Sequence, residues 1–436
     1  MMFAKYDAYK DSGDKWIGKT PTGWFNERLG TILEPISIKG NADKDLLSIT
    51  RERGVILRDI EDDSENHNFI PDDLSNYKLI EKGQFGMNKM KAWQGSYGVS
   101  PYTGIVSPAY YIFRFIKPIY PDFFHWAIRS KTYISFFGSA SDGVRIGQWD
   151  LSKDRMKNIP FVFPNIDSQK KIVEFIKDKA GKIDQAIAIK EQQIALLNER
   201  KQIVIQKAVT QGLDPNVPMK DSGVEWIGQI PEHWHIKKLK YLAQVEGGFA
   251  FSSDSFKDEG VQLLKISNLY MNTLSLERQP TFLDEKYLNT HSKWVVSKGD
   301  ILMSLTGTLG KKDYGFAVLL EDDNKFFLNQ RVGKINFNTD IDKFFILNQL
   351  QSDVFLDQIY QLPSGTKQAN LSNEHIENVY LIIPNLNEQK HIANFIAELV
   401  QANQILIENT LKEIDLLKEY KTTLINDAVT GKIKVA

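Results

Sequence analysis

The sequence predicts an α+β chain in which two mixed α/β domains are separated by two long antiparallel coiled-coil helices with pseudo-twofold symmetry. Three observations predict this fold class. Two segments of the chain recur, the longer one has the apolar period of a coiled coil, and short apolar alternations typical of strands lie between the repeats. At 436 residues, the chain is long enough for two or three domains.

An internal repeat organises the chain. Residues 10–29 contain the pattern KDSG, WIG, Pro, Trp and Leu, which returns at residues 220–239. Residues 164–210 return without gaps at 384–430, and about a third of the positions are identical. The stretches between these segments show no clear similarity to each other. Constant frames around variable inserts indicate a duplicated scaffold that carries two different domains.

The longer repeat predicts two helices that pack on each other. Its apolar residues alternate at spacings of four and three, the period of a coiled-coil seam. Gly181 is expected to divide the first copy into a short helix near 167–180 and a long helix near 182–210, of about 28 residues or roughly 42 Å. Antiparallel packing of the two helices would return the C-terminus to the N-terminal motif. The alternative to a spacer between two domains is an ordinary pair of core helices within one domain. The seam consists of Ile183, Ile187, Ile194, Leu197, Val204 and Ala208, interrupted by Lys190 and Lys201, and of Ile407, Ile414, Leu417, Leu424 and Ala428, interrupted by Thr410 and Lys421.

The repeat divides the chain into four parts. These are a first domain at 1–160, a first spacer helix region at 161–212, a second domain at 213–380 and a second spacer helix region at 381–436. Each domain is expected to be α+β. Apolar alternations predict strands at 104–106, 110–115, 301–303 and 316–320, and helical patterns lie at 121–131 and 342–360.

Composition narrows the class of protein. The absence of cysteine excludes disulfides and thiolate metal sites and fits a reducing compartment. No apolar run approaches the length of a membrane span, and the N-terminus lacks a signal-peptide pattern, so a soluble cytoplasmic protein without a membrane partner is expected. The net charge of −1 hides an uneven distribution: residues 41–81 carry 5 Lys/Arg and 11 Asp/Glu, whereas residues 85–157 carry 10 and 4. The neutral total therefore does not exclude nucleic acid.

Residues 88–100 combine cations, amides, hydroxyls and aromatic rings on a loop with two glycines, and a second polar loop lies near 145–149. Lys and Gln can bind base edges in the major groove, while hydroxyls and backbone amides can bind phosphates. Trp93 and Tyr97 could equally be core aromatics, and Lys89 and Lys91 could be solvated surface cations. The candidate DNA-binding residues of the first domain are Lys89, Lys91, Trp93, Gln94, Ser96, Tyr97, Arg145 and Gln148.

The second domain has similar clusters of small polar and basic residues at 299–312, 329–331 and 364–372. Their position beside apolar runs is typical of loops on a sheet. Such hydroxyl-rich glycine loops also bind nucleotides or sugars in other proteins. The candidate DNA-binding residues of this domain are Ser304, Thr306, Thr308, Lys311, Lys312, Gln330, Arg331, Thr366, Lys367 and Gln368.

These segments resemble a known family. Residues 88–100 with 104–110 are similar to one type of recognition domain in the specificity subunits of Type I restriction–modification enzymes, and 299–311 with 364–368 are similar to another type. Residues 164–210 resemble the spacer helices of that family. The resemblance covers nearly the whole chain.

The resemblance implies a non-catalytic subunit that recognises a bipartite, asymmetric target in double-stranded DNA. It also implies that the chain docks two methyltransferase subunits and, through them, restriction subunits. Methylation would occur at N6 of adenine. No cofactor is expected on this chain, because S-adenosylmethionine, ATP and Mg²⁺ would bind the partner subunits.

Motifs for catalysis are weak. The segment Ser107-Pro108-Ala109-Tyr110 lacks the second proline of an amino-methyltransferase loop, and residues 307–312 are too short between glycines for a phosphate-binding loop. The seven histidines show no metal-ligand spacing. The alternatives are a standalone DNA methyltransferase or nuclease with an atypical site, and a coiled-coil adaptor that binds only proteins. Activity of the purified chain would favour the first, and a lack of salt-dependent DNA affinity the second.

Overall fold

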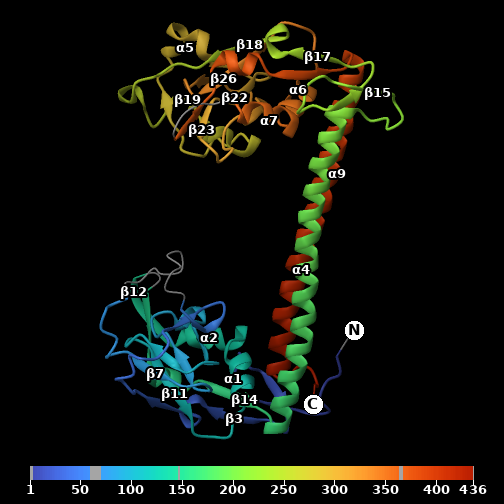
Figure 1. Ribbon diagram of the computed structural model, residues 1–436. Helices are drawn as coiled ribbons and strands as arrows, with labels where there is room; N and C mark the ends of the chain where they lie inside the picture. Colours follow the sequence, from blue (N-terminus) through green and yellow to red (C-terminus); the bar gives the residue numbers. More distant parts are fainter. Residues whose placement is uncertain (1–2, 59–69, 146–147, 363–366, 436) are drawn as a thin grey trace. The chain divides into compact units, whose positions relative to one another are not determined.

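The computed structural model describes residues 3–58, 70–145, 148–362 and 367–435. The chain forms two compact units: the first comprises Met1–Glu191 with Thr410–Ala436, and the second comprises Gln192–Asn409. Each unit contains a mixed α/β domain and one end of each of two long helices, α4 (Ile166–Gln211) and α9 (Leu386–Val429) (Figure 1). The predicted fold class is confirmed. Among the described residues, none of the helices combines the length and apolar character that crossing a bilayer requires.

Both long helices are continuous. α4 has 46 residues and α9 has 44, and α4 passes through Gly181 without a break. The predicted division at Gly181 and the predicted length of about 28 residues are therefore wrong. An interior glycine costs a helix only about 1 kcal/mol relative to alanine. Buried apolar residues on both sides of it, Ala180 and Ile183, supply packing that offsets this cost.

In the first unit the two long helices run antiparallel. Lys421 of α9 donates to Asp184 of α4 at 2.7 Å, and Lys190 of α4 pairs with Glu413 of α9. As the residue numbers rise along α4, those of their partners fall along α9, so the predicted antiparallel orientation is confirmed at this end. The predicted seam residues that are buried in this unit are Ile183, Ile187, Thr410, Ile414, Leu424 and Ala428.

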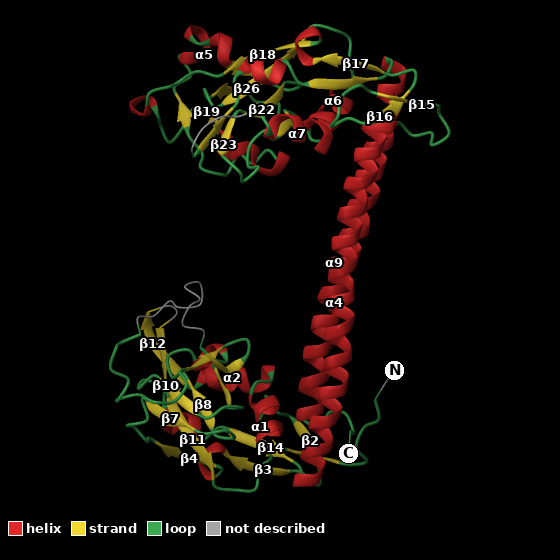
Figure 2. Cartoon of the chain, viewed as in Figure 1, coloured by secondary structure: helices red, strands yellow, loops and turns green. Residues whose placement is uncertain are grey.

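The first domain is built on a four-stranded antiparallel sheet with the order β4 (Leu33–Ile36), β11 (Tyr111–Phe115), β8 (Phe85–Met87) and β9 (Tyr97–Val99). Three further pairs are β5 (Leu47–Thr50) with β6 (Gly54–Leu57), β7 (Lys78–Ile80) with β10 (Gly104–Val106), and β12 (Ser141–Arg145) with β13 (Gln148–Leu151). The helices are α1 (Pro121–Ile128), α2 (Lys131–Ser139) and α3 (Lys153–Lys157) (Figure 2). The strands predicted at 104–106 and 110–115 are confirmed, and the predicted helix at 121–131 ends at Ile128.

Aromatic side chains fill the core of this domain. α1 buries Phe123, Phe124, Ala127 and Ile128, which share one face because the helical repeat is 3.6 residues. The ring of Phe124 lies 5.1 Å from that of Phe85 in the sheet and 4.8 Å from that of Phe161. Phe161 belongs to strand β14 (Pro160–Phe163), which leads into α4. The core thereby joins the sheet to the start of the long helix.

The second domain has two four-stranded sheets. One has the order β18 (Ala243–Gly247), β26 (Val332–Phe337), β22 (Ile301–Ser304) and β24 (Ala317–Leu319), and the other has the order β20 (Phe282–Leu283), β19 (Val261–Leu264), β25 (Phe326–Leu328) and β21 (Val295–Val296). Strand β23 (Thr306–Thr308) pairs with β27 (Gln368–Asn370). The helices are α5 (Tyr287–Thr290), α6 (Lys343–Leu350), α7 (Asp353–Tyr360) and α8 (Asn373–Glu377).

The strands predicted at 301–303 and 316–320 are confirmed as β22 and β24. The helical pattern at 342–360 forms two helices, α6 and α7, because Ser352 adopts an extended conformation between them. Its hydroxyl accepts a hydrogen bond from the Phe355 amide at 3.3 Å. Serine is a favoured residue at such a helix start.

The repeated sequence motifs build the same frame in both units. The frame strands of the first unit are β1 (Tyr9–Asp11) with β2 (Lys19–Pro21) and β3 (Phe25–Arg28) with β14, and those of the second are β15 (Met219–Asp221) with β16 (Gln229–Pro231) and β17 (His235–Lys238) with β28 (Tyr380–Ile383). Buried Gln169 at the start of α4 donates to the Pro164 carbonyl and accepts from the Tyr120 amide, both at 2.8 Å. Buried Gln389 at the start of α9 makes the equivalent two bonds at 2.9 and 3.0 Å.

The C-terminal segment lies against the N-terminal frame within the first unit. The Lys434 amide donates to the Ala4 carbonyl at 2.7 Å. Gly431 has a φ of +76°, and a Cβ there would come within 2.6 Å of Pro21. A larger residue would therefore push the C-terminal segment off the frame. The predicted return of the C-terminus to the N-terminal motif is confirmed.

Candidate nucleic-acid interface

In the second unit, strand pairing joins two of the predicted polar segments. Thr308 of β23 lies opposite Gln368 of β27, and the Leu309 amide donates to the Lys367 carbonyl at 3.3 Å. The exposed Thr308, Lys367 and Gln368 therefore lie together at one end of this two-stranded ladder. Segments about 60 residues apart in the sequence form one surface.

The third polar segment of this domain lies beside the same ladder. The Leu305 amide donates to the Arg331 carbonyl at 2.9 Å, and the Leu305 carbonyl accepts from the Leu371 amide at 2.8 Å. Leu305 is thus held between the 330–331 loop and the segment after β27. Gln330 and Arg331 are exposed. The structure therefore places the 330–331 loop beside the residue that leads into β23.

The turn after β23 has a fixed conformation. Lys312 has a φ of 52°, and its ammonium lies 3.7 Å from Asp357 and 5.2 Å from the ring centre of Tyr360. Tyr360 donates to the Lys312 carbonyl at 3.2 Å. Burial, with the neighbouring Tyr314 and acidic groups, raises the pKa of Tyr360 to about 12, so its hydroxyl stays protonated and can keep this bond. Lys312 is therefore held in place before any ligand arrives.

In the first unit, the two predicted loops also meet. The Leu151 amide donates to the Lys89 carbonyl at 3.2 Å, and the Lys89 ammonium lies 3.0 Å from Asp150. The hydrogen bond to Asp150 raises the pKa of Lys89. The rings of Trp93 and Trp149 lie 5.0 Å apart at an angle of 42°. The β12–β13 hairpin and the 88–100 segment therefore form one surface.

Arg129 fixes the 88–100 segment from behind. Its guanidinium donates to the carbonyls of Tyr97 (2.6 Å) and Gly95 (3.3 Å). The other arm donates to the carbonyls of Arg51 and Glu52 at 2.8 Å each. Because the planar guanidinium has donors in a rigid fork, one side chain ties the turn between β5 and β6 to this segment.

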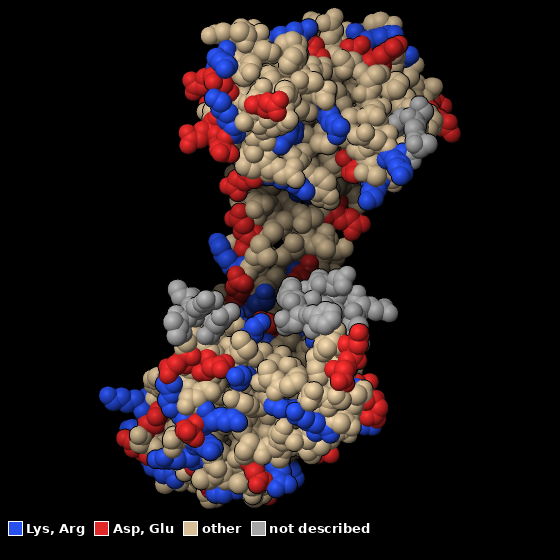
Figure 3. Space-filling view, turned by 90° about the vertical axis from the view of Figure 1, so that its left-hand side faces the viewer, with Lys and Arg blue, Asp and Glu red and all other residues tan. Residues whose placement is uncertain are grey.

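The first unit also has a cluster of lysines, which consists of Lys39, Lys78, Lys89 and Lys153. The sequence predicted only Lys89 among these as a DNA-binding residue. The half-buried Lys78 donates to the Tyr110 carbonyl at 2.7 Å, and Lys153 lies over the Tyr111 ring at 4.3 Å. Burial and the positive charges of Lys153, Lys39 and Lys89 lower the pKa of Lys78. Crowded cations of this kind attract an anion such as a phosphate. Figure 3 shows Lys and Arg side chains spread over one face of this unit.

Four of the predicted DNA-binding residues are corrected, because their side chains are buried. Tyr97 packs with its ring centre 4.5 Å from that of Phe137. It is therefore a core aromatic, the alternative that the sequence analysis gave for this residue. Ser96, directly before strand β9, is buried, and the buried Ser304 hydroxyl accepts a hydrogen bond from the Phe316 amide at 3.0 Å. Thr306 is buried as well. None of these four side chains offers a surface for DNA: Ser96, Tyr97, Ser304 and Thr306.

The remaining predicted residues stay predictions. Lys91, Lys311, Gln330, Arg331, Lys367 and Gln368 are exposed, and Lys89, Trp93 and Gln94 are half-buried. Thr366 lies outside the described residues. Of Arg145 and Gln148, only the backbone pairing across the β12–β13 hairpin is described.

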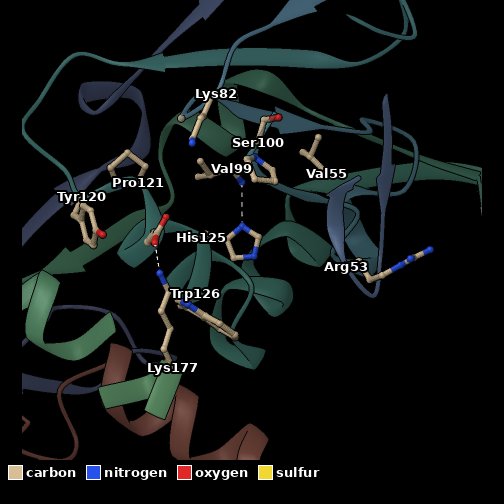
Figure 4. A pocket seen from close by; sticks show the side chains of 13 residues that line it. Arg53, Val55, Lys82, Val99, Ser100, Tyr120, Pro121, His125, Trp126 and Lys177 are labelled. Atoms are coloured by element: carbon tan, nitrogen blue, oxygen red, sulfur yellow. Dashed lines mark hydrogen bonds and ion pairs between the residues drawn. The ribbon is translucent and has the colours of Figure 1, made fainter. Parts of the chain in front are cut away.

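A cavity of about 460 Å³ lies on the first unit between α1, α4 and the loop after β9, lined in part by Arg53, Lys82, Tyr120, His125, Trp126 and Lys177 (Figure 4). His125 Nδ1 accepts a hydrogen bond from the Val99 amide at 3.2 Å. Burial, and then the charge of Arg129, lower the pKa of His125 to about 4. The imidazole is therefore neutral at pH 7 and holds α1 to β9. Among the residues that the structure describes, no three His, Asp or Glu side chains gather as a metal site would require.

Comparisons with known proteins point to one family. The family model described as the Type I restriction modification DNA specificity domain matches residues 231–416. The Type I restriction enzyme MjaVIII specificity subunit of Methanocaldococcus jannaschii is 32% identical over 302 residues, which cover 69% of this chain and 68% of that protein. The MjaIX specificity subunit of the same organism is 22% identical over 436 residues, which cover 98% and 92% of the two chains.

Two solved structures share the fold. The HsdS subunit from Thermoanaerobacter tengcongensis matches with a TM-score of 0.54 and 14% identity, covering 95% of this chain and 98% of that chain. A chain from a structure concerned with complex assembly and conformational transition of the type I R-M system matches with a TM-score of 0.65 and 15% identity, covering 94% and 98%. At these identities the likeness concerns the fold.

Proposed function

Because this chain belongs to the specificity subunits of Type I restriction enzymes and is therefore a subunit that recognises a DNA target, we propose that it reads a bipartite, asymmetric sequence, one half with each unit. The repeated frame and the unlike inserts carry this proposal. Both units present the same frame strands and the same buried glutamine bonds. The inserts differ, because the first domain has one four-stranded sheet and the second has two. Unlike surfaces on a repeated frame favour two unlike half-targets.

Each unit has a surface suited to this task. In the first unit the surface consists of the 88–100 segment, the β12–β13 hairpin and the lysine cluster. In the second it consists of the β23–β27 ladder, the turn at 308–312 and the 330–331 loop. Lysines and arginines can neutralise phosphates, whereas Gln and Thr side chains can bind base edges. The division into four parts at 160, 212 and 380 assigns these surfaces to 1–160 and 213–380.

The two long helices set the spacing between the half-sites in this proposal. α4 passes from the first unit into the second as one uninterrupted helix. A spacing of about one DNA turn, roughly 34–36 Å or ~10 bp, keeps two binding sites on one face of a duplex. The bases between the two half-sites would then go unread.

Exchange of one domain tests this proposal. The full chain is co-expressed with its methyltransferase partner, and the methylated motif is mapped by sequencing of the host DNA. Replacement of residues 30–160 by the corresponding segment of a relative is expected to change one half of the motif and leave the other half and the spacer unchanged. A change in both halves, or none, would contradict the division of labour.

We propose two docking surfaces for methyltransferase subunits on the long helices, with restriction subunits attached through them. The helices carry large apolar side chains that are exposed in each unit. In the first unit these are Ile189, Leu411 and Leu416, and in the second Leu196, Ile203, Ile405 and Leu406. Apolar side chains grouped on exposed helices are typical of protein contacts. Leu416→Glu is expected to weaken co-purification of the methyltransferase, with Lys412→Glu as a control on an exposed charged position of the same helix.

Chemistry is assigned to the partners. S-adenosylmethionine, ATP and Mg²⁺ would bind the methyltransferase and restriction subunits, and this chain would position them on the target. The purified chain, given S-adenosylmethionine or Mg²⁺ and DNA, is expected to leave the DNA unmodified. Methyl transfer or cleavage by the chain alone would favour a standalone methyltransferase or nuclease instead.

A further inference from the structure

The loop at 266–281 of the second unit concentrates unusual backbone conformations. Among the described residues, four non-glycine residues have a positive φ: Met271 (54°), Asn272 (57°), Gln279 (52°) and Lys312 (52°). Three of the four lie in this loop. Left-handed backbone conformations are unfavourable for residues with a Cβ and persist only where the surrounding structure holds them. The backbone of this loop is therefore strained at Met271, Asn272 and Gln279.

Buried hydrogen bonds hold this strained loop. The fully buried Asn268 side chain donates to the carbonyls of Ser275 and Arg278, both at 2.9 Å, and accepts from the Lys265 amide at 2.8 Å. At the tip, Asn272 Oδ1 accepts from the Ala317 amide of β24 at 2.9 Å. The tip is thus tied both to its own loop and to the sheet.

The tip presents apolar side chains to solvent. Met271 has an exposed fraction of 67% and Tyr270 of 41%. Single apolar side chains on a surface are common and carry no meaning alone. Here, however, the backbone at Met271 adopts an unfavourable conformation, and buried bonds keep it there. Such an arrangement suits a side chain that is placed for a ligand.

The surroundings of the tip favour DNA as that ligand. The Arg278 guanidinium lies 4.4 Å from the Tyr270 ring centre and is exposed, so a planar cation stands beside the apolar tip. Tyr270 also packs edge-on against Phe316 at 5.6 Å, and the Phe316 amide is bonded to Ser304. Ser304 directly precedes Leu305, which joins the polar segments of the candidate interface. The tip therefore packs at the end of the β22–β24 pair from which the chain enters β23 of the candidate interface.

We propose that Met271 is a wedge that inserts between two stacked base pairs in the half-target read by the second unit, with Arg278 on an adjacent phosphate. Proteins that bend DNA use methionine and other apolar side chains in this way, because the lost base stacking is replaced by contacts with the side chain. The buried bonds hold the backbone at Met271 in place, so insertion costs the freedom of the methionine side chain but needs no ordering of the loop. This inference rests on the proposed function and adds a means of sensing DNA deformability to it.

Fluorescence of 2-aminopurine tests the wedge. The full chain in complex with its methyltransferase partner is mixed with duplexes in which single bases of the second half-target are replaced by 2-aminopurine, which brightens when it is unstacked. The adenine that becomes methylated is left out of the series. Wild type is expected to brighten the probe several-fold at one base step. Met271→Gly is expected to abolish this rise and weaken binding about tenfold.

Two variants control for folding and for the loss of a methionine. Glycine adopts a φ of 54° without strain, so Met271→Gly is expected to keep or raise the melting temperature. Met219→Ala removes another exposed methionine of the second unit, on frame strand β15, and is expected to leave both fluorescence and affinity unchanged.

The outcomes separate the wedge from the proposed function. A wild-type complex that binds a defined target without brightening any probe overturns the wedge and leaves target recognition intact, as does a rise that persists in Met271→Gly. Loss of the methyltransferase partner from Met271→Gly, with DNA fluorescence unchanged, would show that the tip contacts protein. A wild-type complex with no sequence-dependent DNA binding overturns both proposals.

Discussion

Acidification is expected to destabilise the first unit through His125. The pKa of this side chain falls from 6.5 to about 4 on folding, because the ring is buried and lies near Arg129. Above pH 6.5 the imidazole is neutral in both the folded and the unfolded chain and has no effect. Between pH 6.5 and 4 the unfolded chain binds a proton that the folded chain excludes, so the free energy of unfolding falls as the pH falls.

The size of this effect follows from the two pKa values. At 1.36 kcal/mol per pKa unit, the free energy of unfolding decreases by about 3 kcal/mol over this range. Asp122 opposes the shift, but it is paired with Lys177 at 2.6 Å. Arg53 and Lys82 also line the cavity beside the ring and add positive charge that disfavours the imidazolium.

Urea denaturation of the full chain at pH 7, 6, 5 and 4 measures the effect. His125→Gln is expected to unfold more easily than wild type at pH 7 but to show a shallower pH dependence, with the two curves converging toward pH 4. His391→Gln, at an exposed position of α9, serves as the control and should keep the wild-type slope. Parallel curves for wild type and His125→Gln would refute the assignment of a neutral, buried His125.

Three further predictions concern the lysine cluster, the helix seam and the guanidinium clamp. Lys78→Ala should reduce the slope of log DNA affinity against log salt concentration by about 0.9, the value of one phosphate contact. Lys298→Ala is the control and should leave this slope unchanged, because the Lys298 cation pairs with Asp323. Fluorescence anisotropy in a salt series measures both slopes. Ile414→Ala in the buried seam should lower the free energy of unfolding by about 3 kcal/mol. Lys421→Ala removes a surface ion pair and should lower it by less than about 1 kcal/mol. Equal effects of the two substitutions in urea denaturation would contradict a helix pair held by its apolar seam. Arg129→Lys should lower the melting temperature of the first unit and its free energy of unfolding by about 2 kcal/mol, because a single ammonium cannot donate to carbonyls on two segments. An unchanged melting temperature would count against the guanidinium clamp.

The long helices and frames could be predicted because their signals are local and repeated. The spacing of four and three from Ile183 to Ala208 defines the seam by itself, and its copy in α9 confirms it. The break predicted at Gly181 does not occur, because tertiary packing outweighs the local preference of this residue. Glycine disfavours a helix only weakly, and the buried residues around it keep α4 continuous.

The candidate interface could be predicted only in part. Polar glycine-containing loops mark the segments, but burial depends on strand pairing that the sequence does not show. Tyr97 of β9 packs on Phe137 of α2, and the preceding Ser96 is buried too, so neither side chain reaches the surface. Lys78 and Lys153 are 75 residues apart in the chain and come together only because β7, β8, β10 and β11 bring Tyr110 and Tyr111 between them. No local pattern could have identified that cluster.

The strain at Met271 was likewise invisible in the sequence. Asn272 is a residue type that readily adopts the left-handed conformation, but Met271 is not, and no glycine marks this turn in the sequence. The strain follows from buried Asn268, whose three hydrogen bonds fold the loop back on itself.

The mapped methylation motif shows whether the two domains recognise DNA independently of each other. Cells that express this chain with its methyltransferase partner should carry N6-methyladenine at one motif made of two unlike half-sites separated by a fixed number of unread bases. Exchange of residues 30–160 should then replace one half-site and preserve the other. A single continuous motif, a palindrome, or a motif altered on both sides by that exchange would contradict two independent recognition domains on a shared helical frame.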